Sequence, residues 1–140
     1  MYEDKETIMI DGKKLICSNQ IKTTGFGVGY SSLDCPRCGS HNLHHMKVIN
    51  YDQEEENENL TIVTTVKNKL ITLDVRASNE GNPSRRRDGI VISFFCEQCF
   101  YPESDLIDNS LNPTIELCIE QHKGTTFLSW RYTPLEENDK

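Results

Sequence analysis

The chain has 140 residues, of which 36% are hydrophobic and 26% are charged, and its formal net charge is −7. This size accommodates one domain with a modest core, and no internal repeat indicates a solenoid or an array. The opening residues 1–7 lack a basic and apolar leader, and no apolar run reaches membrane-spanning length, so we expect a cytoplasmic protein without membrane contact. Two acidic stretches, 52–58 and 136–140, carry the whole net charge and are interpreted as a solvated loop and a frayed tail.

The N-terminal region, residues 1–34, shows the signals of a short hairpin followed by a linker. The dipeptide Asp11-Gly12 separates two strand-like stretches, and it favours the mirror-image turn that joins antiparallel strands. The glycine-rich segment 25–30 lacks the Gly-Lys-Ser/Thr ending of a phosphate loop. We therefore predict a mobile linker or a thin edge strand there, and no nucleotide cradle.

Four of the six cysteines form two C-x-x-C pairs, Cys35 with Cys38 and Cys96 with Cys99. Each pair has the spacing of a zinc knuckle, and Gly39 supplies the positive-φ residue that such a turn usually needs. Four thiolates leave no open position for water or substrate, so we predict one structural Zn²⁺ ion held by these four cysteines. The alternative of disulfides is disfavoured because paired knuckles in a reducing compartment rarely form them.

Strand patterns continue between the two cysteine pairs. Residues 43–51 alternate as a strand, and residues 60–67 and 70–77 flank a two-residue turn, Asn68-Lys69. Pairing across that turn produces one apolar and one polar face, as a half-buried antiparallel pair requires. The predicted apolar partners are Ile62 with Val75, Thr64 with Leu73 and Val66 with Ile71, and the polar partners are Thr61 with Arg76 and Thr65 with Thr72. Residues 90–95 form a continuous apolar run, which we place at the centre of the sheet.

The C-terminal part of the chain shows the same pattern of two strand-like stretches separated by a short turn. Residues 114–122 and 125–133 flank the turn Lys123-Gly124. The predicted apolar partners are Ile115 with Tyr132, Leu117 with Trp130 and Ile119 with Leu128, and the reverse face pairs Glu116 with Arg131 and Cys118 with Ser129. One short helix is predicted over residues 102–108.

The motifs CPRCGS and FFCEQC, each leading into or out of a strand, resemble the zinc-ribbon class, in which two rubredoxin-like knuckles sit at the ends of β-hairpins. The chain departs from that class by carrying a further β-hairpin and an acidic loop between its knuckles. The string of LHH, GNPSRRRDG, FFCEQC and QHKGTTFLSW also resembles small uncharacterised zinc-ribbon proteins of bacterial phages and mobile elements. This second resemblance implies a short accessory protein that binds a host component.

Together these patterns predict a mostly β fold, an antiparallel sheet with a Cys₄ zinc ribbon and an inserted β-hairpin. We divide the chain into an N-terminal hairpin and flexible linker (1–34), a single zinc-ribbon β domain (35–133) and a disordered acidic tail (134–140).

Three consecutive arginines, Arg85, Arg86 and Arg87, occupy a loop bounded by glycine and proline. Guanidinium groups present forked donors to phosphate or carboxylate, so we single out these residues as partner-binding. The alternative, which we weigh equally, is a solvated hairpin tip that partly neutralises the acidic stretch 52–58. Three phosphate contacts on duplex nucleic acid would produce a salt slope of only about −2.7, so this loop alone would bind weakly.

Three histidines, His41, His44 and His45, follow the first knuckle. We assign them no metal role, because neighbours on a strand point to opposite faces and four cysteines already saturate an ion. Cys17 and Cys118 are interpreted as packed thiols, since acidic neighbours of Cys118 oppose the lowered pKa that a reactive thiol needs.

The sequence thus favours a non-enzymatic zinc-ribbon binding protein that recognises a protein partner, with an accessory or inhibitory role in a phage or mobile element implied by the resemblance. The acidic balance penalises approach to a polyanion, so a nucleic-acid-binding zinc ribbon that uses the Arg85–Arg87 loop is the second hypothesis. A metal-dependent enzyme is the third, because no nucleophile–base arrangement and no open metal position can be identified. The sequence is compatible with a monomer and with a homo-oligomer.

Overall fold

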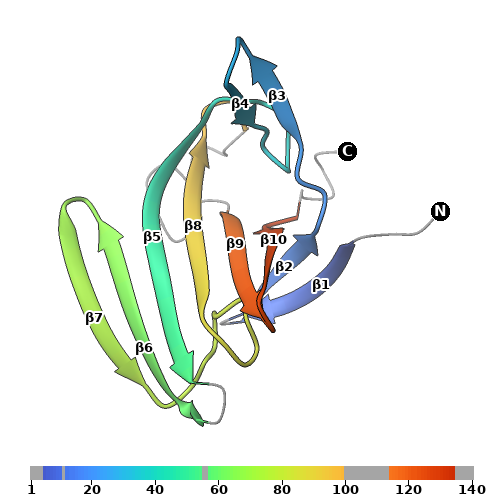
Figure 1. Cartoon of the computed structure of the whole chain (residues 1–140). Coiled ribbons are helices and arrows are strands. Elements are labelled where there is room, and N and C mark those ends of the chain that lie inside the picture. The colour runs from blue at the N-terminus through green and yellow to red at the C-terminus, as the bar shows by residue number, and fades with distance from the viewer. Residues whose placement is uncertain (1–4, 11, 55–56, 100–113, 135–140) are drawn as a thin grey trace.

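The computed structural model describes residues 5–10, 12–54, 57–99 and 114–134. Every regular element in these ranges is a β-strand, which confirms the predicted mostly β fold class (Figure 1). The strands are β1 (Lys5–Ile10), β2 (Lys13–Ser18), β3 (Thr23–Phe26), β4 (Tyr30–Leu33), β5 (Leu43–Glu54), β6 (Asn57–Lys67), β7 (Leu70–Arg76), β8 (Gly89–Cys96), β9 (Ile115–His122) and β10 (Thr125–Tyr132). The predicted helix at 102–108 and the tail beyond residue 134 lie outside the described residues. No helix able to cross a membrane occurs in the described ranges.

Eight strands form one antiparallel sheet in the order β1-β2-β10-β9-β8-β5-β6-β7, and β3 pairs with β4 in a separate two-stranded sheet. Figure 1 shows the large sheet curving across the molecule and the β3–β4 hairpin standing at one end of it. The tight turns explain several of these pairings. Asn68 and Lys69 adopt φ angles of 54° and 67°, as a two-residue mirror-image turn requires.

The two long hairpins have the predicted registers. Ile62 pairs with Val75 across the β6–β7 hairpin, and Leu117 pairs with Trp130 across the β9–β10 hairpin. The other predicted partners of both hairpins also pair as predicted. The apolar run of β8 lies between β9 and β5, at the predicted central position. Alternation of polar and apolar residues therefore determined these pairings correctly.

The N-terminal hairpin also forms as predicted, and it belongs to the large sheet. Ile8 pairs with Leu15 across the β1–β2 turn, and β2 pairs with β10 through Ser18 opposite Trp130. The following segment forms the β3–β4 hairpin, which corresponds to the expected thin strand more closely than to a linker. The division of the chain at residues 34 and 35 stays a prediction.

Cross-strand partners point to the same side of a sheet, so the registers assign each residue to one of two faces. We call the face that carries Tyr51, Val63, Val91, Cys118 and Arg131 the inner face, and the face that carries Val48, Val66, Ile71, Ile92 and Leu117 the outer face. One core cluster, around Val91, lies on the inner face. The other, around Trp130, lies at the end of the sheet where the cysteines gather.

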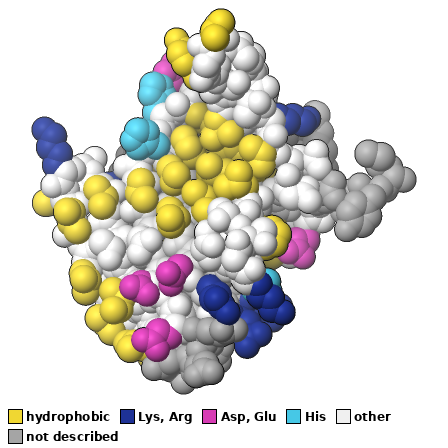
Figure 2. Space-filling model, viewed as in Figure 1, with side chains coloured by type: hydrophobic (Ala, Val, Ile, Leu, Met, Phe, Trp, Pro, Cys, Tyr) yellow, Lys and Arg dark blue, Asp and Glu magenta, His cyan; other side chains and the backbone are white. Residues whose placement is uncertain are grey.

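The outer face remains largely uncovered over the β6–β7 hairpin. Ile71, Leu73 and Val75 are 73%, 67% and 58% exposed, whereas Thr61 on the opposite face is fully buried. Figure 2 shows hydrophobic side chains gathered over the central strands on this side and extending toward the hairpin. The register of this hairpin was predicted, but its apolar face is the open one. β6 and β7 are the last two strands of the sheet, and the exposed fractions show that the described segments leave this face of β7 uncovered.

A loop over residues 77–88 returns the chain from β7 to β8 beside the inner face. Asn82 Nδ2 donates to Gln53 Oε1 and to the Arg87 carbonyl, both at 3.0 Å, and Ser84 Oγ donates to the Gln121 carbonyl at 3.2 Å. These bonds hold the loop against Gly89, where a Cβ atom would meet Asn82 and would lie 2.9 Å from the Pro83 ring.

We expect Gly89→Ala to destabilise the protein by roughly 1–3 kcal/mol, because backbone and loop must move apart to admit the methyl group. Urea unfolding followed by the fluorescence of Trp130, the single tryptophan, measures the change. Gly25→Ala is the matched control, since no atom lies within 4 Å of the added methyl group there. Equal unfolding midpoints for the two variants would contradict this packing.

Candidate metal centre

The first knuckle follows β4 and forms a tight turn around Cys35. The Gly39 N–H donates to the Cys35 carbonyl at 2.8 Å, and the Cys35 N–H donates to the Ser40 carbonyl at 2.7 Å. The Arg37 N–H points at the Cys35 sulfur, 3.4 Å away. Gly39 adopts a φ of 85°, as expected from its position after the second cysteine. Backbone N–H groups thus already face the sulfur that would carry negative charge.

The second knuckle begins at the last residue of β8. Cys96 pairs with Leu43 at the start of β5, and the Glu97 N–H donates to the Asn42 carbonyl at 3.1 Å. Because β5 starts shortly after the first knuckle, the β5–β8 ladder carries the second knuckle directly to the first. The sheet therefore brings together two pairs that are far apart in the sequence.

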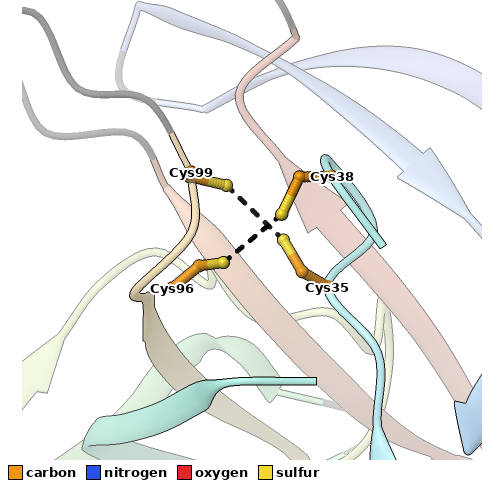
Figure 3. Close-up of side chains that lie close together, drawn as sticks. All are labelled: Cys35, Cys38, Cys96 and Cys99. Carbon is orange, nitrogen blue, oxygen red and sulfur yellow. Dashed lines mark hydrogen bonds between the residues drawn. The ribbon is translucent and has the colours of Figure 1, made fainter. Parts of the chain in front are cut away.

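The four predicted ligand sulfurs converge on one point (Figure 3). The Cys35 and Cys99 sulfurs are 3.6 Å apart, the Cys38 and Cys96 sulfurs are 3.5 Å apart, and all four lie within 4.8 Å of one another. A tetrahedral zinc ion with Zn–S bonds of about 2.3 Å requires sulfurs about 3.8 Å apart. The arrangement therefore fits a tetrathiolate metal centre, in which each cysteine supplies one ligand.

Hydrogen bonds and burial shift the pKa values of three thiols in the cluster. A hydrogen bond from the Cys99 thiol, helped by the Cys38 and Arg37 N–H groups, lowers the pKa of Cys35 to about 5 against the effect of burial. The same hydrogen bond raises the pKa of Cys99 by holding its proton, and burial raises the pKa of Cys38. Close-packed thiols thus share protons that a metal ion would replace.

The site is closed by the surrounding core. Cys35, Cys96 and Cys99 are buried and pack with Ile115, Trp130 and Tyr132, whereas Cys38 is exposed. An aromatic contact between Trp130 and Phe94, with ring centroids 5.8 Å apart, extends this cluster. The metal centre and this part of the hydrophobic core therefore form one unit. With four protein ligands, a bound ion would have no position for a substrate.

The three histidines near the first knuckle take no part in the sulfur cluster. Among the described residues, the group placed to hold a metal contains only the four cysteines. His44 contacts Glu97 through its Nε2 atom, and His41 packs edge-on against Phe26 with ring centroids 5.1 Å apart. These contacts account for two of the histidines without a ligand role.

The predicted partner-binding arginines lie in the 77–88 loop, remote in sequence from the first knuckle. Arg85 and Arg86 are exposed and Arg87 is half-buried. The loop backbone is ordered by bonds from Gln53 Nε2 and Asn79 Nδ2 to the Arg85 carbonyl, at 3.2 and 3.1 Å. Arg85 and Arg86 are therefore exposed residues on an anchored loop, and their binding role stays a prediction.

Sequence reasoning missed a buried polar network on the inner face. Arg131 Nε donates to Glu116 Oε1 at 2.7 Å, and Arg131 is 5% exposed. Ser93 Oγ donates to the other carboxylate oxygen of Glu116 at 3.4 Å. The cross-strand pairing of opposite charges was visible in the sequence, but its burial depends on strands that are distant in the chain.

A cavity of about 900 Å³ opens beside this network, between the β1–β2 hairpin and the 77–88 loop. Arg85 and Arg131 contribute positive charge to its lining, and Glu6 and Glu120 contribute negative charge. The mixture of signs selects neither an anion nor a cation.

Comparisons with protein-family models, with curated proteins and with solved structures found no match. What the structure supports is a cluster of four cysteines able to hold a metal ion, in a chain whose described elements are all β-strands. Tetrahedral sets of four thiolates are typical of zinc and of iron–sulfur sites, and elemental analysis distinguishes the two.

We expect the native protein to contain one zinc ion per chain and to lose its tertiary structure when a chelator removes that ion. Structural zinc contributes roughly 10–16 kcal/mol in zinc-finger peptides, as much as the whole stability of a typical domain. Cys96→Ser should abolish stoichiometric zinc and cooperative unfolding, as measured by elemental analysis and thermal denaturation. Cys17→Ser is the control, because Cys17 lies outside the cluster. A Cys96→Ser protein that binds zinc and unfolds as the native protein does would refute the site.

The buried thiol of Cys118 should make the stability of the protein depend on pH in the alkaline range. Burial raises the pKa of its thiol from 9.0 to about 12, with Glu116 and Glu120 adding to the effect and Arg131 opposing it. The unfolded thiol ionises first as the pH rises, so the contribution of Cys118 to stability is complete below pH 9 and is lost between pH 9 and about 12. Cys118→Ala should flatten the fall in urea midpoint across that alkaline range. An unchanged slope would show that Cys118 is not buried as a neutral thiol.

Proposed function

We propose that this protein is a non-enzymatic, zinc-stabilised β protein whose function is to bind another protein. The observation that carries the proposal is the exposed apolar outer face, on which Ile71 and Leu73 are 73% and 67% exposed and Leu128 is 47% exposed. Monomeric proteins rarely expose contiguous apolar patches above a few hundred Å², and larger ones mark interaction sites.

The metal centre supports a structural role for the ion in this proposal. Four cysteines complete a tetrahedral shell, so a zinc ion held there would fasten the two knuckles and would not activate water. The rigid end of the sheet would then present the outer face as a fixed surface. A preformed surface loses less conformational entropy on binding than a flexible one does.

Charge also favours a protein partner. The chain has a net charge of −7, which opposes approach to nucleic acid, whereas exposed arginines beside acidic segments suit a protein with complementary patches. In this proposal the apolar outer face forms the interface, and Arg85 and Arg86, on the loop beside the inner face, steer the approach of the partner. We place the protein in the cytoplasm, as an accessory or inhibitory component of a phage or mobile element, on the strength of the sequence resemblance.

The surface can be tested with two adjacent residues of β10. Leu128 and Phe127 are each 47% exposed, and as neighbours on a strand they point to the outer and the inner face respectively. We expect Leu128→Lys to abolish capture of a stoichiometric partner from a bacterial lysate, because a charge would be buried in the apolar interface. Phe127→Lys should leave capture unchanged.

Equal capture by both variants would contradict binding through the outer face. A salt-dependent mobility shift with nucleic acid, abolished when Arg85, Arg86 and Arg87 are all replaced by alanine, would instead support the nucleic-acid hypothesis. Both readouts require that the variants keep the zinc content and the unfolding midpoint of the native protein.

A further inference from the structure

Strand β7 forms an open edge of the large sheet. Among the described strands its only neighbour is β6, and all seven of its residues are exposed. Natural proteins usually protect such edges with prolines, bulges, inward charges or a covering segment. β7 contains no proline, and its register with β6 runs without a shift. It therefore offers a regular template for one more strand.

The turn before β7 determines which backbone groups are free at this edge. In a hairpin with a two-residue turn, the two flanking residues form a hydrogen-bonded pair, and bonded and non-bonded pairs then alternate along the strands. The flanking pair here is Lys67 with Leu70. The N–H and C=O groups of Ile71, Leu73 and Val75 consequently point away from β6. These three residues also carry the exposed apolar side chains.

β7 is complementary to itself in one antiparallel register. A two-fold axis at Leu73 sets Leu73 opposite its own copy, Ile71 opposite Val75 and Thr72 opposite Asp74, so apolar residues meet apolar residues on the outer face. At the two ends of the pairing, on the inner face, Leu70 lies opposite Arg76. An axis at Asp74 would oppose two carboxylates directly, and an axis at Thr72 would pair fewer of the outward backbone groups. Asp74 already has a positive partner in its own chain, Arg76, whose Nε lies 2.7 Å from it.

We propose that two copies of this chain associate through antiparallel pairing of their β7 strands about a two-fold axis at Leu73, which joins the two large sheets into one. The interface is a single strand pair with its flanking side chains, at the small end of specific interfaces. The dimer is therefore reversible and its population depends on concentration.

The other open edge of the sheet is less suited to a second copy. By the same alternation, the outward groups of β1 belong to Lys5, Thr7 and Met9. A two-fold axis at Thr7 would place each Lys5 ammonium opposite the apolar Met9. In β7, by contrast, all three residues with outward backbone groups are apolar, and Arg76 lies on the inner face with Asp74 as its partner.

The proposed dimer uses the outward backbone groups of β7, whereas partner binding uses the outer-face side chains, so the two interfaces share Ile71 and Leu73 but not Leu128. Pairing through β7 leaves the side chains of β8, β9 and β10 accessible, so Leu128→Lys should not affect dimerisation. Loss of the dimer and loss of partner capture are therefore distinguishable, because substitutions on different strands control them.

Sedimentation velocity of the full-length, zinc-loaded protein across a wide concentration range tests the proposal. The native chain should shift from monomer to dimer as concentration rises. Leu73→Lys should weaken the dimer at least roughly tenfold, because like charges would face each other at the axis. Leu73→Pro should also dissociate it by removing an outward N–H, while the β6–β7 bonds keep their donors.

Thr72→Lys tests the register. In the proposed dimer the new ammonium lies opposite Asp74 of the other copy, so the dissociation constant should fall. In a register with its axis at Thr72, two lysines would meet and the constant should rise. Leu128→Lys is the matched control for an added charge elsewhere on the outer face and should dimerise as the native chain does. Urea unfolding of each variant verifies its fold.

Three results would overturn the proposal. The first is a native chain that stays monomeric at every concentration. The second is that the Leu73→Lys and Leu73→Pro proteins fold and dimerise as strongly as the native chain. The third is a Thr72→Lys protein whose dimer is weaker than the native one. A dimer lost in Leu128→Lys but retained in Leu73→Lys would place the contact on the sheet face instead of its edge.

Discussion

The convergence of four cysteine sulfurs is the constraint on which the rest of the structure depends. Two knuckles separated by residues 39–95 meet at the end of the β5–β8 ladder, with sulfurs 3.5 and 3.6 Å apart. Closing a flexible loop of that length costs about 3.5 kcal/mol of chain entropy, and a structural zinc ion supplies several times that amount. Because Trp130 and Tyr132 pack with the cysteines, separation of the two knuckles would also open this part of the core.

The inner face buries polar side chains beside its apolar cluster, and the outer face exposes apolar side chains over the β6–β7 hairpin. The inner face buries Arg131 against Glu116, together with Gln53 and Thr61, whereas the outer face exposes Ile71, Leu73 and Val75. A buried ion pair contributes little net stability but strongly penalises the loss of either partner, so it specifies how these strands must align. An uncovered apolar face contributes nothing to the stability of the isolated chain. In the proposed function a protein partner covers this face.

Sequence patterns predicted the local pairings because they depend on residues close together in the chain. Alternation in 60–77 and 114–133, with short turns at Asn68-Lys69 and Lys123-Gly124, admitted one register each, and the structure has those registers. The two C-x-x-C pairs predicted their own meeting because only a shared site uses all four thiolates. For the glycine-rich segment the sequence left a linker and a thin strand as alternatives, because the β3–β4 hairpin has no alternating apolar face.

By itself, the sequence determined the mostly β class, the hairpin registers and the four cysteines of the metal cluster, because each follows from side-chain period, turn chemistry or ligand spacing. Only the tertiary structure decided which face of each hairpin is covered, that β2 pairs with β10, and that β7 is left as an edge. These outcomes depend on the order of strands across the whole sheet. A hairpin has the same period of two whether its apolar side meets a core, a partner or water, so burial could not be inferred from the alternation that revealed the strands.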